Sequence, residues 1–278
     1  MRIGTRDFEI GKKTYLMGIL NVTPDSFSDG GQYDTPPKAL QRLQEMVAWG
    51  ADIIDVGAES TRPGAIPLTA AEEQERLRLV LPLLLQHTTV PISLDTYHAE
   101  TAKLGIAMGV HIINDVWGLQ YAPEPYAMAK TVAAGNIPVI IMYNSRATKP
   151  DDTANIMTRA GNFLRRSLEI AAEVGISHAN IILDPGIGFG TTPEEDLTLL
   201  KNLAQLKKQD NETFPLLVGL SRKGFLGKLL DLPPDNRLVA TAVISALAAV
   251  NGADILRLHA VREIAPALQL VSQIVTKY

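Results

Sequence analysis

The seven residues YLMGILN (Tyr15–Asn21) read as a buried β-strand that stops at a polar side chain. The stretch is apolar on both faces, which is typical of a strand covered on both sides. The chain then leaves this apolar stretch and runs mostly polar, through Thr, Pro, Asp, Ser and Gly, as far as Gly31. Such a run is either a long surface turn or a binding loop mounted on a strand end.

The same order of features recurs along the chain: a short apolar run, a polar residue at its end, and then a helical stretch. Strands are expected at Tyr15–Leu20, Asp52–Val56, Pro91–Leu94, His111–Asn114, Pro138–Met142, Ile181–Leu183, Leu216–Leu220 and Ile255–Leu258. Helices are expected at Pro37–Trp49, Ala70–Gln86, Ala99–Met108, Pro125–Ala134, Ala154–Val174, Pro193–Lys208, Asn236–Val250 and Ile264–Val275.

Eight strands that alternate with eight helices, without short hairpin turns between them, imply parallel pairing. Eight repeats favour a closed (β/α)8 TIM barrel of the α/β class over an open doubly wound sheet. No linker or low-complexity segment divides the sequence, so residues 1–278 are predicted to form a single domain. Residues Ile3–Ile10 are expected to form a small N-terminal β-hairpin that covers the bottom of the barrel.

The composition excludes several classes of function. A net charge of −4 argues against nucleic acid or a membrane as partner. The chain has no cysteine, which removes disulfides, thiolate zinc sites and cysteine nucleophiles. The N-terminus has no apolar signal core, and the longest apolar run, Leu238–Val250, is too short to span a bilayer. We therefore expect a cytoplasmic protein.

The ends of the predicted strands are polar, and in a barrel all these ends meet at one mouth. They are Asn21, Glu59-Ser60, Asp95, Asn114-Asp115, Tyr143-Asn144, Asp184, Ser221-Arg222-Lys223 and Arg257–His259. A polar residue at one strand end means little, but a polar residue at each of eight ends indicates a binding site.

The residue types at the mouth indicate the kind of ligand. Carboxylates accept hydrogen bonds and a carboxamide both donates and accepts. Asp95, Asn114 and Asp184 can therefore form hydrogen bonds with the polar edge of a flat heterocycle. Arg and Lys suit phosphate or carboxylate groups. The cationic residues near these ends are Arg62, Arg222, Lys223 and Arg257. The sequence thus predicts a site for a polar ring with an anionic group.

Other motifs fail. Gly186–Gly190 lacks the spacing of a dinucleotide-binding turn, and Phe225 stands where a P-loop that begins at Gly219 needs lysine. The five histidines show no metal-ligand spacing. Ser221 has no evident His–Asp pair to activate it.

Five motifs, taken in order, resemble the dihydropteroate synthase family. They are Ile19–Gly31, Glu59–Gly64, Asp184–Gly190, Ser221–Lys223 and Arg257–His259. The resemblance covers the chain from about Tyr15 to its end. It implies a TIM-barrel transferase of folate biosynthesis that joins 6-hydroxymethyl-7,8-dihydropterin diphosphate to p-aminobenzoate. The products are 7,8-dihydropteroate and pyrophosphate, and Mg²⁺ is the cofactor.

The resemblance also implies roles for individual residues. The positions that match the family's pterin site are Asp95, Asn114, Asp184 and Lys223, with Phe189 beside them. Those that match its diphosphate site are Asn21, Arg257 and His259, with Asn21 as the metal ligand. Those near p-aminobenzoate and the closing loops are Thr61, Arg62 and Ser221. In the loop after Asn21, Phe27 is expected to cover the aromatic substrate, and Asp25 either contacts substrate, steers the loop or caps a turn. Catalysis is expected to depend on Asp95, Asp184, Lys223 and Arg257. Competition by sulfonamides and a homodimer formed through late helices are further expectations.

The sequence departs from the family pattern at several positions. Tyr143 stands where His is frequent, Thr191 where Lys is frequent and Ala260 where Asp is frequent. None of these positions belongs to the implied pterin site. Three alternatives remain open: a pterin-binding methyltransferase, a non-catalytic pterin-binding module, and an aldolase that forms a Schiff base on Lys223.

Overall fold

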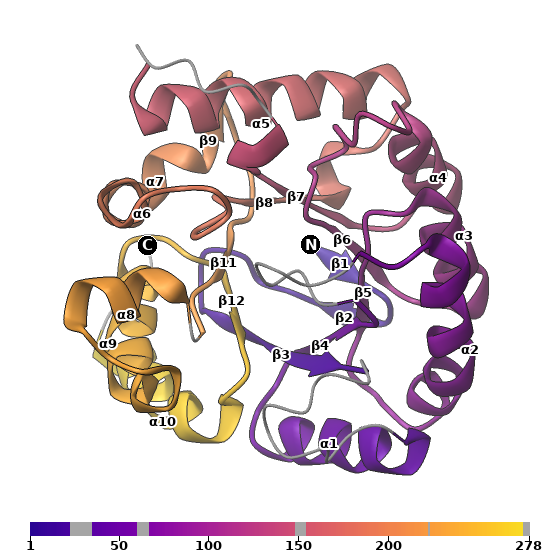
Figure 1. Cartoon of the computed structure of the whole chain (residues 1–278), viewed down its shortest axis with the longest axis horizontal. Coiled ribbons are helices and arrows are strands. Elements are labelled where there is room, and N and C mark those ends of the chain that lie inside the picture. Colours follow the sequence, from indigo (N-terminus) through magenta and orange to yellow (C-terminus); the bar gives the residue numbers. More distant parts are fainter. Residues whose placement is uncertain (23–34, 60–66, 148–153, 222, 275–278) are drawn as a thin grey trace.

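The computed structural model describes residues 1–22, 35–59, 67–147, 154–221 and 223–274. Eight parallel strands form one sheet in the order β11-β12-β3-β4-β5-β6-β7-β8, with helices around it (Figure 1). The strands are β3 (Tyr15–Asn21), β4 (Ile53–Gly57), β5 (Ile92–Asp95), β6 (Ile112–Asp115), β7 (Val139–Met142), β8 (Ile181–Asp184), β11 (Leu217–Gly219) and β12 (Ile255–Leu258). All eight predicted strands are confirmed.

The sheet closes on itself between β8 and β11. Leu183 forms a parallel bridge with Leu216, and the Leu183 amide donates to the Pro215 carbonyl at 2.9 Å. The two end strands of the sheet therefore lie side by side, and the predicted (β/α)8 TIM barrel is confirmed.

The helices cover the outside of the barrel. They are α1 (Pro36–Ala48), α2 (Ala70–Gln86), α3 (Ala99–Met108), α4 (Ala127–Gly135), α5 (Ile156–Glu173), α6 (Pro193–Lys201), α7 (Leu203–Leu206), α8 (Gly224–Leu230), α9 (Leu238–Val250) and α10 (Val261–Ile274). Helices α2 and α6 begin with complete capping boxes, in which Thr69 pairs with Glu72 and Thr192 with Glu195.

The predicted helix Pro193–Lys208 is wrong as one unit. It breaks at Asn202, whose side-chain amide donates to the Thr198 carbonyl at 2.7 Å and so satisfies the backbone at the end of α6. A short antiparallel hairpin of β9 (Lys208–Gln209) and β10 (Glu212–Thr213) follows α7. The prediction also missed α8, because the glycines within Gly224–Leu230 weaken the helical pattern.

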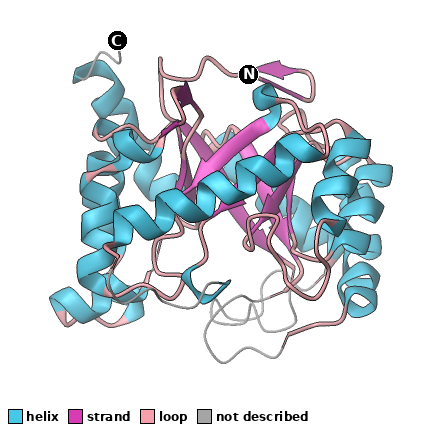
Figure 2. Ribbon diagram, turned by 90° about the horizontal axis from the view of Figure 1, so that it is seen from above, coloured by secondary structure: helices cyan, strands magenta, loops and turns pink. Residues whose placement is uncertain are grey.

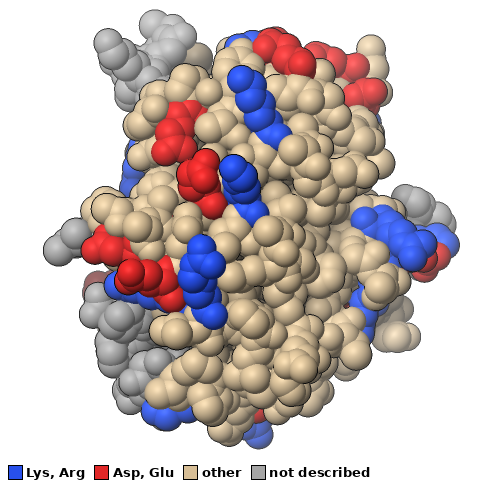
Figure 3. Space-filling model, turned by 90° about the vertical axis from the view of Figure 1, so that its right-hand side faces the viewer, with Lys and Arg blue, Asp and Glu red and all other residues tan. Residues whose placement is uncertain are grey.

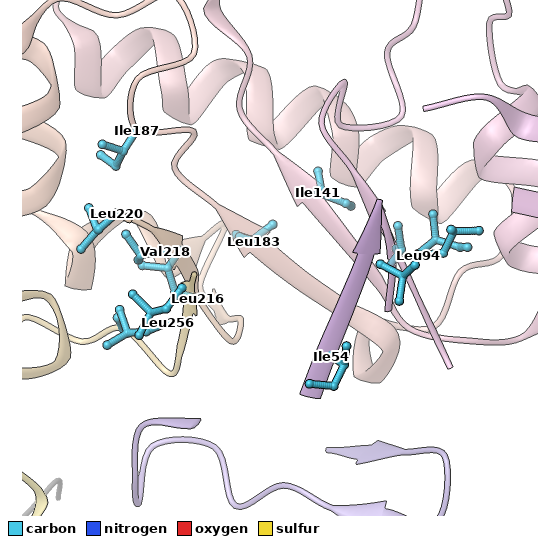
Figure 4. Close-up of a cluster of buried hydrophobic side chains, with 14 of the residues drawn as sticks. Ile54, Leu94, Ile141, Leu183, Ile187, Leu216, Val218, Leu220 and Leu256 are labelled. Carbon is cyan, nitrogen blue, oxygen red and sulfur yellow. The ribbon is translucent and has the colours of Figure 1, made fainter. Parts of the chain in front are cut away.

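Alternate residues of each strand face opposite sides of the barrel wall. One set packs outward against the helices, as Figure 4 shows for side chains such as Ile54, Leu94 and Ile141. The other set points into the barrel. At its lower end the inward residues form a separate apolar cluster that includes Met17, Ile53, Ile112, Ile140, Ile182, Leu217 and Ile255.

The predicted N-terminal hairpin is confirmed and closes that lower end. Strand β1 (Arg2–Ile3) pairs with β2 (Arg6–Asp7), and the pair lies at one end of the barrel (Figure 2). Ile3 is 0% exposed and Phe8 is 3% exposed, and both belong to the lower apolar cluster. The barrel bottom is therefore a packed plug.

On the face formed by α2, α3 and α4, acidic and basic side chains lie next to one another (Figure 3). Among the described residues, no helix is both long enough and apolar enough to cross a membrane.

Candidate active site

The inward side chains change from apolar to polar two residues further along the strands. Ile53 is followed on the same face by Asp55, Ile112 by Asn114, Ile182 by Asp184 and Ile255 by Arg257. A period of two places both members of each pair inside the barrel. Three of the upper members, Asn114, Asp184 and Arg257, line a pocket at the mouth together with Asp95, Phe189 and Lys223, and Asp55 lies buried behind them.

Arg257 joins two carboxylates in this layer. Its Nε donates to Asp55 Oδ2 at 2.6 Å, and its Nη2 donates to Asp95 Oδ2 at 2.5 Å. Asn114 Nδ2 also donates to Asp55 Oδ2, at 3.1 Å. Burial opposes the charge on Arg257, but Asp55 and Asp95 outweigh it and hold the pKa of Arg257 above its usual value. The guanidinium is therefore a fixed cation.

The pocket carboxyls have raised pKa values. Burial raises the pKa of Asp95 to about 7, against the opposing effect of Arg257. Burial also raises the pKa of Asp184 to about 6, while the Gly186 amide, which donates to Asp184 Oδ1 at 2.8 Å, and the charge of Lys223 lower it. Perturbed carboxyls in a pocket are typical of functional sites.

Lys223 and Phe189 form one wall of the pocket. The Lys223 ammonium lies 4.3 Å from the centre of the Phe189 ring, a cation–π contact. Burial lowers the pKa of Lys223 to about 8, partly offset by the negative charge of Asp184. The wall thus presents a desolvated cation to any ligand between the strands.

Asn21 lies at the end of β3, beside the pocket. Its neighbour in register is Gly57, and the next strand along pairs Gly57 with Asp95. A Cβ on Gly57 would lie 3.7 Å from Asn21 Oδ1 and 3.5 Å from the Asp95 Cβ. The glycine therefore leaves a gap between the two polar side chains.

Ser221 and His259 lie next to each other after β11 and β12. The His259 amide donates to Ser221 Oγ at 3.2 Å, and the His259 carbonyl accepts from Arg42 Nη2 at 3.2 Å. Neither residue lines the pocket in the described part of the chain. The structure therefore places this pair at the mouth, outside the polar layer.

The polar side chains at two other strand ends form hydrogen bonds with the backbone of the loops. Asp115 accepts from the amides of Trp117 and Leu119 at 2.9 and 2.7 Å, and thus shapes the turn after β6. Asn144 Nδ2 donates to the Val116 carbonyl at 3.0 Å. Four predicted site residues, Asp25, Phe27, Thr61 and Arg62, lie outside the described residues.

Sequence reasoning missed Asp55. It is 0% exposed and bonds to both Arg257 and Asn114, but in the sequence it lies inside the apolar run Asp52–Val56. Its Oδ1 is buried and has no hydrogen-bond partner among the described residues. The sequence nevertheless indicates that Asp55 faces the barrel interior, because alternation along β4 puts Ile53, Asp55 and Gly57 on one face of the strand.

The comparisons with known proteins identify the family. The model of the pterin binding enzyme family matches residues 17–259. A dihydropteroate synthase of Clostridium beijerinckii is 40% identical over 278 residues, which is 100% of both chains.

Solved structures are similar over nearly the whole chain. A dihydropteroate synthase of Clostridium difficile, solved in the presence of pteroic acid, is 41% identical with a TM-score of 0.89, covering 98% of this chain and 100% of that one. A Yersinia pestis dihydropteroate synthase with a sulfonamide drug complex is 34% identical, also with a TM-score of 0.89, covering 99% and 98%. The fold, the pocket and these relatives together establish that the chain belongs to the dihydropteroate synthase family of pterin-binding enzymes.

Proposed function

We propose that the mouth pocket binds 6-hydroxymethyl-7,8-dihydropterin diphosphate and that the enzyme joins it to p-aminobenzoate, releasing pyrophosphate. The observation that carries this proposal is the polar layer formed by Asp55, Asp95, Asn114, Asp184 and Arg257 above an apolar plug. A flat ring with several N–H donors fits such a layer, because carboxylate and carboxamide oxygens accept hydrogen bonds.

Asp184 and Asn114 supply complementary groups for the pterin ring. Because Asp184 Oδ1 accepts the Gly186 amide, Oδ2 is the oxygen assigned to the ring's donors. Asn114 directs Nδ2 to Asp55, so its carbonyl oxygen is assigned to another ring N–H. Lys223 Nζ, on the wall formed with Phe189, is assigned to a ring acceptor.

The chemistry requires the bond between the methylene carbon and the diphosphate oxygen to break. The electron pair leaves with the diphosphate, and the dihydropterin ring carries the cationic methylene. The carboxylates around the ring stabilise this positive charge. The amine of p-aminobenzoate then forms the new C–N bond and loses a proton. This mechanism needs no nucleophile from the enzyme.

Mg²⁺ is proposed as the cofactor, with Asn21 as its protein ligand. The described residues hold no group of three His, Cys, Asp or Glu side chains suited to a metal. A single carboxamide oxygen fits Mg²⁺, which retains several waters and takes substrate phosphate oxygens. When bound, the ion neutralises charge on the leaving diphosphate. Arg257 and His259 are also assigned to the diphosphate of the substrate.

The assay that tests the proposal measures pyrophosphate. Release is expected when the pterin diphosphate, p-aminobenzoate and Mg²⁺ are all present, and sulfonamides are expected to compete with p-aminobenzoate. Pterin binding without pyrophosphate release would favour a non-catalytic binding module. Borohydride trapping of a carbonyl substrate on Lys223 would favour the aldolase.

We also propose that the chain forms a homodimer through α9. Val239, Val243 and Leu247 lie on one helix face at intervals of four residues and are 76%, 56% and 56% exposed. Exposed apolar residues on α8 and α10 include Leu230, at 52%, and Leu270, at 61%. Helices α9 and α10 contact each other, and exposed apolar side chains gathered in this way mark protein–protein contact.

Sedimentation equilibrium of wild type and of a Val243→Glu/Leu247→Glu variant tests the dimer. The variant is expected to sediment as a monomer. A matched variant on the opposite side of the barrel, Leu79→Glu in α2, changes a side chain that is 70% exposed and should leave the dimer intact. A monomeric wild type would exclude the dimer.

A further inference from the structure

The turn Gly186–Gly190 supports the wall formed by Phe189 and Lys223. Gly186 and Gly188 have φ values of 66° and 78°, in the left-handed region. A Cβ on Gly186 would lie 1.7 Å from the Tyr143 carbonyl oxygen, and one on Gly188 would lie 3.2 Å from Lys223 Cδ. The turn is thus pressed between the end of β7 and the lysine stem, so its position sets both side chains of the wall.

Asp196 holds this turn from outside the pocket. It lies in the first part of α6 and is 1% exposed, and it does not belong to the described pocket lining. Its Oδ1 accepts the Gly188 amide at 2.8 Å and the Thr191 hydroxyl at 2.5 Å. Thr191 Oγ1 also accepts from the Gly188 amide, at 3.1 Å. A buried carboxylate is costly unless it is hydrogen-bonded, and here one bond goes to the turn and the other to Thr191, which directly follows it.

The negative charge of Asp196 also acts on the Lys223 ammonium. The groups that act on the ammonium come from four elements: Asp184 of β8, Arg257 of β12, Asp196 of α6 and Asp95 of β5. Asp184, Asp196 and Asp95 favour the charged lysine, and Arg257 disfavours it. Asp196 therefore influences Lys223 through the turn and through its charge, without lining the pocket.

We propose that Asp196 is a positioning residue, which through Gly188 and Thr191 holds the turn that carries Phe189, the ring against which Lys223 lies. This inference rests on the proposed function in one respect: it takes the pterin as the ligand that Lys223 meets. The reacting atoms do not touch Asp196, so the effect reaches them through the lysine.

Three variants separate the two effects. Asp196→Ala removes the acceptor, Thr191→Val removes the hydroxyl, and Asp196→Asn keeps an oxygen acceptor but removes the charge. The matched control is Asp254→Asn. Asp254 is 0% exposed at the opposite end of the barrel, where it accepts from the Leu216 amide and pairs with Lys207.

Calorimetric titration with pteroic acid measures the binding effect. Asp196→Ala is expected to weaken binding about ten-fold, the usual scale for a lost buried hydrogen-bond partner, and Thr191→Val somewhat less. Asp196→Asn should bind within about three-fold of wild type at pH 7. The Asp254 control should lower the melting temperature and leave the affinity unchanged.

The pH profile measures the charge effect. Removing a negative neighbour lowers the pH at which Lys223 loses its proton, so in Asp196→Asn the alkaline fall of kcat/KM should move to lower pH. The Asp254 control should keep the wild-type profile. Wild-type affinity and an unshifted alkaline fall in the Asp196 variants, with only a lower melting temperature, would overturn the proposal.

Two precautions keep this test decisive. If Asp196→Ala does not fold, Asp196→Asn and Thr191→Val decide the question, because both are close in volume to the native side chains. A wild-type protein that binds pteroic acid but releases no pyrophosphate would overturn the proposed function. The binding comparison would still test the positioning role.

Discussion

The two ends of the barrel are built from the same strands and have opposite chemistry. At the lower end, Ile53 and Ile255 pack with Ile3 and Phe8 of the hairpin. Two residues later on the same strands, Asp55 and Arg257 form an ion pair at the mouth. The hairpin covers the lower end, and the mouth holds a pocket lined by charged and polar side chains.

Buried polar groups also serve different purposes at the two ends. At the lower end, Asp254 pairs with Lys207 at 2.6 Å and accepts from backbone amides, so its bonds tie the chain together. At the mouth, Asp55 Oδ1 is buried without a hydrogen-bond partner among the described residues. The polar groups of the lower layer therefore stabilise the barrel, whereas the upper layer keeps a buried acceptor that no described residue satisfies.

The largest expected effect is that of Arg257→Met. It would leave Asp55 and Asp95 buried without their cation. We expect kcat/KM for the pterin diphosphate to fall about a thousand-fold, the upper range for loss of an electrostatic stabiliser. The control is Arg165→Met, which breaks an exposed pair with Asp210 and should stay within two-fold of wild type, since exposed pairs contribute about 1 kcal/mol or less. An Arg257→Met variant that retains a tenth of the activity would contradict the assigned role.

Asp184→Asn should have the next largest effect. The amide oxygen can still accept from Gly186, but the charge toward the ligand is lost. We expect pterin binding to weaken on the order of 10- to 100-fold, as for a hydrogen bond to a charged group. Titration calorimetry with Asp210→Asn as the surface control checks this. Equal losses in the two variants would remove Asp184 from the binding site.

Phe8→Ala tests the opposite end. Phe8 is 3% exposed and its ring centre lies 4.7 Å from that of Tyr15. Replacing it should cost about 3–5 kcal/mol of unfolding free energy, while kcat/KM below the unfolding transition should change less than about two-fold. Thermal unfolding and steady-state kinetics measure both. A large loss of kcat/KM without a loss of stability would show that the two ends are not separate in function.

The smallest expected effect is a difference in pH dependence. Asp184 holds its proton up to about pH 6 in the folded chain, against an ordinary pKa of 3.8. The folded state therefore binds more protons, and it loses stability relative to the unfolded chain as the pH rises from about 4 to about 6. Asp184→Asn avoids this loss. The melting temperature of the variant minus that of wild type should therefore increase between pH 4 and pH 7. The difference in melting temperature between Phe8→Ala and wild type should not change with pH. If the melting temperatures of Asp184→Asn and wild type also change in parallel with pH, the pKa of Asp184 is not raised in the folded chain.

Most strands and helices were predictable because their signals are local. The helices Ala70–Gln86 and Ala99–Met108 were predicted to the residue, with caps and apolar periods that act over one or two turns. Prediction failed where a side chain bonds its own backbone, as Asn202 does at the end of α6. It also failed for α8, which is short and rich in glycine.

The candidate site was partly predictable because parallel strands bring their ends together. Asp95, Asn114, Asp184, Lys223 and Arg257 were predicted and lie in one pocket. Asp55 was missed, because a carboxylate inside an apolar run acquires meaning only when Arg257, 202 residues later, is placed beside it. The predictions of a homodimer, of Mg²⁺ and of a cytoplasmic location stay predictions.

By itself, the sequence determined the alternation of strands and helices, the polar strand ends and the family, because each depends on neighbouring residues or on short motifs. Tertiary structure decided which polar residues share a pocket and which shape a loop. Asp184 and Asp115 both end strands and both accept amides of the turn that follows, but of the two only Asp184 lines the pocket. The physical reason is the side of the barrel wall that each carboxylate faces, which depends on the register of strands far apart in the chain.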